Sequence, residues 1–232
     1  MEDRKIEIVM NLEKYVIGLD DTFAFTCRSC GACCRQREDI LLTAKDLFRI
    51  AVKLELTMKQ TIEKYCDVYI GHNSRIPIVR LQPIGALNVC PLLHKNRCII
   101  HDAKPVVCAL FPLGRVLKYG NLQTGDMFEK EQLIYIINDF TCGGRRKKQT
   151  VRAWLEQFGI PVKDEYFFLW NKVINNLSTA VRDIKNADAS EKTLEMVMGG
   201  IFTVLYTNYD TKKEFRPQFE ANAKILLNIH VK

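Results

Sequence analysis

The sequence of 232 residues contains no long hydrophobic run. Its longest nearly apolar stretch, Met196 to Tyr206, is much shorter than the roughly 20 residues that a membrane-spanning helix needs. The first ten residues carry mixed charges in place of the apolar core of an export signal. We therefore expect a cytoplasmic protein with no membrane association.

The sequence also lacks internal repeats, low-complexity tracts and a strong charge of one sign. Its net charge is +7, and its one dense basic run is Arg145 to Lys148. Four consecutive cations are usually a solvated turn, so nucleic-acid binding is a minority interpretation. No glycine-rich loop follows a predicted strand, so the usual Rossmann fingerprint of methyltransferases is absent. No Ser/His/Asp or Cys/His arrangement indicates a catalytic nucleophile, and catalytic residues stay unknown.

Cysteine is the residue type that the sequence has in excess. There are nine, in a chain whose 47% hydrophobic and 26% charged residues are typical of a globular protein. In a reducing compartment this usage favours metal binding over disulfides. The odd number and the adjacent Cys33 and Cys34 also argue against disulfides. Eight cysteines form the pattern, and we predict that all eight bind metal: Cys27, Cys30, Cys33, Cys34, Cys90, Cys98, Cys108 and Cys142.

The spacing of these cysteines favours iron–sulfur chemistry, of the 4Fe–4S type, with zinc as the alternative. Cys27, Cys30 and Cys33 have the spacing of an iron–sulfur run, and Pro91 follows Cys90 as a proline follows the last cysteine of that run. Structural zinc more often uses two separated C-x2-C pairs. Adjacent side chains of extended backbone point in opposite directions, so we expect Cys33 and Cys34 to serve different centres or different irons. Two four-cysteine centres, or one cluster with spare cysteines, would satisfy the pattern.

Three further groups of residues are candidates of lower rank. Cys66 follows an apolar-faced helix and is predicted to be a small buried hydrophobe. His101 could bind metal, donate to a cluster sulfur or face solvent in its loop. Positive charges next to the first run could offset the charge of a thiolate-bound cluster; they are Arg28, Arg35 and Arg37.

The pattern of helix and strand signals predicts an α+β protein that is mostly α. We expect a loop-rich cysteine-cluster domain with few short strands over residues 1–148, and a helical C-terminal segment packed on it over residues 149–232. Capping-box signals begin helices after Thr43 and Thr57. Residues 76–81 predict a strand that Pro77 keeps at a sheet edge. Gln132 to Phe140 is a strand or a short buried helix, and Thr150 caps a helix that ends before Gly159.

The C-terminal segment carries signals for three more helices. The first follows Asp164, the second spans Lys192 to Tyr206, and the third spans Pro217 to Ile229. We expect these helices to cover the cysteine-cluster domain, with Phe167, Phe168 and Trp170 as aromatic anchors.

The cysteine segments resemble a known family. Phe25-x-Cys27-x2-Cys30-Gly31-x-Cys33-Cys34-Arg35 is similar to the signature of the CxxCxxCC family of zinc- or iron-chelating proteins, the YkgJ-like cysteine-cluster family. The segments around Cys90 to Ile100, Pro105 to Pro112 and Cys142 to Gly144 agree with it in order. The chain departs from the family's common residues at His101, Lys104 and Ala109, and none of these departures removes a thiol.

The resemblance leaves three functions open. The first is a metalloprotein with a redox or structural role. The family includes flagellin lysine N-methylases, so the second is an S-adenosylmethionine-dependent protein-lysine methylase, for which the partner would be a protein substrate. The third is a zinc-stabilised interaction module that docks a protein partner.

Overall fold

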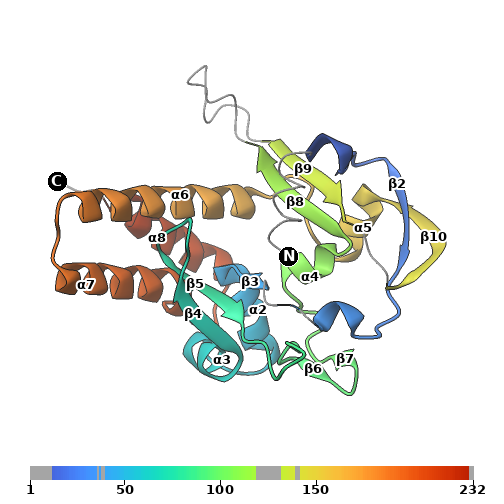
Figure 1. Cartoon of the computed structure of the whole chain (residues 1–232), viewed down its shortest axis with the longest axis horizontal. Coiled ribbons are helices and arrows are strands. Elements are labelled where there is room, and N and C mark those ends of the chain that lie inside the picture. Colours follow the sequence, from blue (N-terminus) through green and yellow to red (C-terminus); the bar gives the residue numbers. More distant parts are fainter. Residues whose placement is uncertain (1–11, 36, 38–39, 119–131, 139–141, 230–232) are drawn as a thin grey trace. The chain divides into compact units, whose positions relative to one another are not determined.

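The computed structural model describes residues 12–35, 37, 40–118, 132–138 and 142–229 (Figure 1). These residues contain more helix than strand, and their short sheets are antiparallel, which confirms the predicted α+β class. None of the helices in the described part is long and apolar enough to cross a membrane.

The chain divides into two compact units, each built from two separate segments. Unit 1 contains Met1–Cys30 and Val106–Asp164, and unit 2 contains Gly31–Pro105 and Glu165–Lys232. The chain passes from unit 1 to unit 2 inside the cysteine run, between Cys30 and Gly31. The sequence analysis predicted one domain over residues 1–148 and a helical segment over residues 149–232. That division stays a prediction.

The described residues of unit 1 form two small sheets and three short helices. One sheet has the strand order β1-β9-β8, and the other pairs β2 with β10. The strands are β1 (Val16–Ile17), β2 (Thr22–Thr26), β8 (Leu113–Lys118), β9 (Gln132–Ile137) and β10 (Gly144–Thr150). The helices are η1 (Leu12–Lys14), α4 (Val106–Leu110) and α5 (Val151–Gln157).

Aromatic rings form the core of unit 1. Side chains alternate between the faces of a strand, so β2 directs both Phe23 and Phe25 inward. The ring of Trp154 on α5 meets the rings of Phe23 and Phe25 edge-on at 5.9 and 5.6 Å. Its indole N–H donates to the carbonyl of Leu110 at 3.1 Å, which fixes α5 against α4.

Two predicted elements of unit 1 are present, the helix after Thr150 and the strand that begins at Gln132. Thr150 caps α5, because its side chain accepts from the N–H of Ala153, and the helix ends before Gly159. The segment that begins at Gln132 is a strand. Its last two predicted residues, 139 and 140, lie outside the described residues.

Unit 2 combines helices with a three-stranded sheet of order β3-β5-β4 and a small hairpin of β6 and β7. In Figure 1, α6 and α7 run side by side in this unit. The strands are β3 (Leu41–Leu42), β4 (Cys66–Ile70), β5 (Pro77–Leu81), β6 (Leu93–His94) and β7 (Arg97–Cys98). The helices are η2 (Ala32–Cys34), α2 (Ala44–Lys53), α3 (Met58–Tyr65), α6 (Glu165–Asn186), α7 (Glu191–Phe202), the π-helical turn η3 (Thr203–Thr207) and α8 (Phe215–Leu227).

Both predicted capping boxes form. At the start of α2 the side chain of Thr43 accepts from the N–H of Asp46, and the Asp46 carboxylate accepts from the N–H of Thr43. Thr57 and Gln60 make the same exchange at the start of α3. These local signals place the two helices before any tertiary contact is considered.

The C-terminal helices pack on α2 through aromatic side chains. The hydroxyl of Tyr166 on α6 accepts from the N–H of Lys45 at 3.0 Å, and the ring of Phe215 on α8 lies 5.2 Å from that of Phe48. Trp170, one of the predicted anchors, is buried, and its ring contacts those of Tyr206 and Phe219 in the C-terminal helices. The other two predicted anchors, Phe167 and Phe168, are only half-buried.

The prediction that Pro77 keeps its strand at a sheet edge is wrong. Strand β5 is the central strand and pairs with both β3 and β4. Pro77 is its first residue and lies opposite Ile70 of β4, whereas the short β3 reaches only Val79 and Arg80. The proline is tolerated because it stands at the start of the strand, beyond the end of β3.

Candidate metal centre

The two units divide the eight patterned cysteines equally. None of the cysteines forms a disulfide. Unit 1 contains Cys27, Cys30, Cys108 and Cys142. Unit 2 contains Cys33, Cys34, Cys90 and Cys98.

In unit 1, the ladder of β2 and β10 positions two of the cysteines. Thr26 pairs with Gly144, so Cys27 and Cys142 lie next to the same end of the antiparallel ladder. The backbone between them is tightly packed: Gly143 has a φ of +84°, and a Cβ there would lie 2.5 Å from the ring of Phe25. Only glycine fits this position without strain.

The other two cysteines of unit 1 are Cys108, next to the core, and Cys30, close in sequence to Cys27. Cys108 lies on α4, and the next residues of that helix are buried in the aromatic core, against which Cys142 also packs. Cys30 follows Ser29, whose N–H donates to the Sγ of Cys27 at 3.4 Å. This hydrogen bond directs a backbone donor at the sulfur of a candidate ligand.

In unit 2, backbone hydrogen bonds join three sequence segments around the cysteines. The carbonyl of Cys34 accepts from the N–H of Cys90 at 2.8 Å, and the carbonyl of Cys90 accepts from the N–H of Leu93 at 3.0 Å. Leu93 pairs with Cys98 across the hairpin of β6 and β7. A Cβ on Gly31 would lie 2.9 Å from Leu93, so the start of η2 approaches the hairpin closely.

The thiols of unit 2 interact with one another. The thiol of Cys33 hydrogen-bonds to Cys34, and this bond, with burial, raises the pKa of Cys33. The bond from Cys33 lowers the pKa of Cys34, but its own hydrogen bond to Cys90 and burial outweigh that effect and raise its pKa to about 11. Burial raises the pKa of Cys98, and the nearby Cys33 adds to the rise. Thiols crowded in this way hold their protons until a cation replaces them.

Two cations face this group of thiols. Lys104 acts to lower the pKa of both Cys33 and Cys98, and Arg37 acts to lower that of Cys33. Arg37 was a predicted neighbour, whereas sequence reasoning gave Lys104 no role. Arg35 donates to the side chain of Asn96 in the β6–β7 turn and therefore helps to hold the hairpin.

The structure also corrects the expectation for the adjacent cysteines. The expected divergence of Cys33 and Cys34 assumed extended backbone, but both lie on the 3-10 helix η2. Successive side chains of that helix are about one third of a turn apart, which allows their thiols to meet. Both cysteines consequently belong to the same unit.

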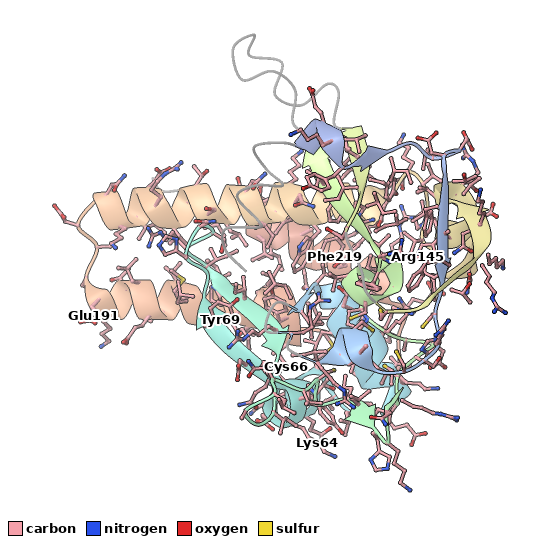
Figure 2. The ribbon with its side chains drawn as sticks, turned by 45° about the vertical axis from the view of Figure 1, so that its right-hand side comes forward. Lys64, Cys66, Tyr69, Arg145, Glu191 and Phe219 are labelled. Atoms are coloured by element: carbon pink, nitrogen blue, oxygen red, sulfur yellow. The ribbon has the colours of Figure 1, made fainter. Side chains whose placement is uncertain are left out.

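His101 and Cys66 differ from the patterned cysteines in their surroundings. His101 is exposed, which matches the solvent-facing interpretation, and desolvation followed by the charge of Lys104 lowers its pKa. Cys66, labelled in Figure 2, is the first residue of β4 and directly follows α3. It is half-buried. Burial, with a smaller contribution from Asp67, raises the pKa of Cys66 to about 12, as expected for an inert buried thiol.

The donor atoms fit a thiophilic metal. Within the described ranges, no three His, Cys, Asp or Glu side chains already stand close enough to hold a metal ion. The residues that the folding does bring together supply sulfur donors, flanked by cations that offset thiolate charge. Sulfur donors of this kind select zinc or iron–sulfur clusters over magnesium or calcium.

Comparison with known proteins gives one match. Residues 26–138, just under half of the chain, match the family model CxxCxxCC, described as "Putative zinc- or iron-chelating domain". The matched segment includes seven of the patterned cysteines and ends before Cys142. No curated protein and no solved structure matches the chain. Residues 26–138 therefore carry the CxxCxxCC domain that the sequence resembles, which supports metal binding by its cysteine cluster.

Proposed function

We propose that this protein holds two iron–sulfur centres, one on the four thiolates of each unit, in a redox or structural role. The observation that carries the proposal is the equal division of the eight patterned cysteines between two compact units. Four cysteines are the ligand set of a [4Fe–4S] cluster. The match to a zinc- or iron-chelating domain supports metal binding and is compatible with either metal.

The close pair Cys33 and Cys34 is compatible with an iron–sulfur centre. A single zinc ion requires four sulfurs to converge on one atom. In a four-iron cluster each thiolate binds its own iron, so adjacent cysteines need not converge on one atom. Cys33 and Cys34 lie in the same unit, so in this proposal they bind two different irons of one cluster.

The surrounding residues suit a negatively charged cluster. Lys104 and Arg37 face the thiols of unit 2, and the Ser29 N–H points at a sulfur of unit 1. Positive charges and hydrogen bonds to sulfur raise the reduction potential of an iron–sulfur centre. When bound, such clusters supply one-electron transfer or a rigid cross-link between chain segments.

The test is quantification of iron, zinc and acid-labile sulfide in protein purified without oxygen. We expect brown protein with about eight iron and eight sulfide per chain, the content of two [4Fe–4S] clusters. The variant Cys34→Ser should lose about half of the iron and sulfide, the content of one cluster, whereas the control Cys66→Ala should keep all of both. Colourless protein with bound zinc and no sulfide would overturn the iron–sulfur assignment.

A further inference from the structure

Strand β4 of unit 2 has an open edge. It is an outer strand of the β3-β5-β4 sheet (Figure 1), and no strand in the described part pairs with its other side. Val68, Tyr69 and Ile70 are 44, 39 and 52% exposed, so the strand presents apolar side chains on both faces. Figure 2 shows Tyr69 on this strand, beyond Cys66 and the end of α3.

The edge lacks the usual protection against pairing. Natural edge strands are kept apart by charged side chains, especially lysine, or by proline, a bulge or very short length. The other edge strand, β3, is only two residues long. Strand β4 runs for five residues, Cys66–Ile70, in continuous register with β5; it contains neither lysine nor proline, and its one charged residue, Asp67, is paired with Arg80 of β5.

The hydrogen-bond pattern shows which backbone groups face outward. Gly71 N–H donates to Ile76 and Gln82 N–H donates to Tyr65, in each case to the residue directly opposite across the β4–β5 ladder. Hydrogen-bonded pairs alternate along an antiparallel ladder. Val68 and Ile70 therefore direct their N–H and C=O groups away from β5, toward the open edge.

We propose that this edge pairs with β4 of a second copy of the chain, antiparallel, across a two-fold axis at Tyr69. In this register Val68 of each copy exchanges both backbone bonds with Ile70 of the other, so all four outward groups of these residues are satisfied. Shifting the axis to Asp67 would oppose two carboxylates, which destabilises a pair. Shifting the axis to Val68 would require the N–H of Cys66 to donate to the second copy, but this N–H already donates to the carbonyl of Ile62.

The side chains are self-complementary in the same register. Val68 and Ile70 of one copy would lie against Ile70 and Val68 of the other, on the sheet face where Val79 and Leu81 are buried. On the opposite face, the Arg80 guanidinium lies 5.2 Å from the Tyr69 ring centre and is bound by Asp67 at 3.2 Å. That ion pair limits repulsion between the Arg80 side chains of the two copies. The result is a continuous six-stranded sheet.

The test is sedimentation of the metal-loaded full chain over a range of concentrations. We expect a reversible dimer whose dissociation constant rises at least tenfold in Ile70→Lys. The matched control is Val52→Lys, a position that is 47% exposed on α2 of the same unit and should leave the dimer unchanged. A monomer at every soluble concentration, or equal sensitivity to the two lysines, would overturn the proposal.

A cross-link tests the register independently of stability. Residues at the two-fold axis of a non-hydrogen-bonded pair have Cα atoms about 4.5 Å apart, within the range for a disulfide. In a Cys66→Ala background, Tyr69→Cys should form a disulfide-linked dimer under mild oxidation, and Val68→Cys should form much less. Faster linking through position 68, or equal linking at both positions, would contradict the proposed axis.

Discussion

Among the glycines of unit 1 that the structure describes, Gly143 should be the least tolerant of a side chain. It joins Cys142 to β10, has a φ of +84°, and a Cβ would lie 2.5 Å from the Phe25 ring and 3.0 Å from the Thr26 carbonyl. The ring cannot move aside easily, since Trp154 and Phe111 flank it at 5.6 and 5.7 Å. We predict that Gly143→Ala displaces the segment that carries Cys142.

The magnitude follows from two contributions. A left-handed backbone conformation costs a residue with a Cβ about 1–2 kcal/mol. Forcing an extra carbon into a packed core adds about 1–3 kcal/mol. Gly143→Ala should therefore lower the free energy of unfolding of unit 1 by about 2–5 kcal/mol.

Gly159 offers a matched control in the same unit. Its φ is +60°, but a Cβ there would have no described atom within 4 Å. Gly159→Ala should therefore cost only the conformational contribution of about 1–2 kcal/mol. Both substitutions reduce the freedom of the unfolded chain equally, so this effect cancels in the comparison.

Urea unfolding followed by tryptophan fluorescence can measure the difference. The chain has two tryptophans, Trp154 in unit 1 and Trp170 in unit 2, so a Trp170→Phe background reports on unit 1 alone. Gly143→Ala should unfold at a lower urea concentration than Gly159→Ala and should also lose metal. Equal midpoints with unchanged metal content would refute the tight contact with Phe25 and its role in placing Cys142.

Three more outcomes test other parts of the structure. Arg115→Met should lower the free energy of unfolding by about 3–5 kcal/mol, because the buried Asp164 carboxylate loses the guanidinium that lies 2.7 Å from it. Thermal unfolding measures this loss, and a change of less than about 1 kcal/mol would contradict the prediction. Thr43→Ala should cost more than the about 1 kcal/mol of Thr57→Ala, since its capping partner Asp46 is buried, and equal costs in urea unfolding would refute the difference. A chain that ends at Asp164 should aggregate and lose metal faster in air, because unit 2 loses α6 and α8; light scattering that shows a stable, metal-loaded monomer would contradict this.

Local signals predicted the helices of this protein well. Thr43, Thr57 and Thr150 each mark a helix start through contacts within three residues, so the sequence contains the whole signal. Non-local pairing was harder to predict. Pro77 indicated an edge strand, but the length of β3 made the proline acceptable in a central one.

The sequence predicts which residues form the candidate site, and the structure shows how they are grouped. The spacing indicates eight cysteines as candidate ligands, and their role as ligands stays a prediction. Their division between units depends on the pairing of Thr26 with Gly144 and on the bond from Cys90 to Cys34, both between segments far apart in sequence. Lys104 was noted only as a departure from the family's common residues, because a single lysine in the sequence does not indicate which thiols it lies near.

Native mass spectrometry of anaerobically purified protein tests the central claim most directly, because it counts the centres on each chain. The wild type should carry the mass of two [4Fe–4S] clusters. Cys142→Ser in unit 1 and Cys98→Ser in unit 2 should each retain the mass of one cluster, and Cys66→Ala should retain both. A wild-type chain that carries a single cluster or only zinc, or a single substitution that removes all bound metal from a folded chain, would contradict two independent centres.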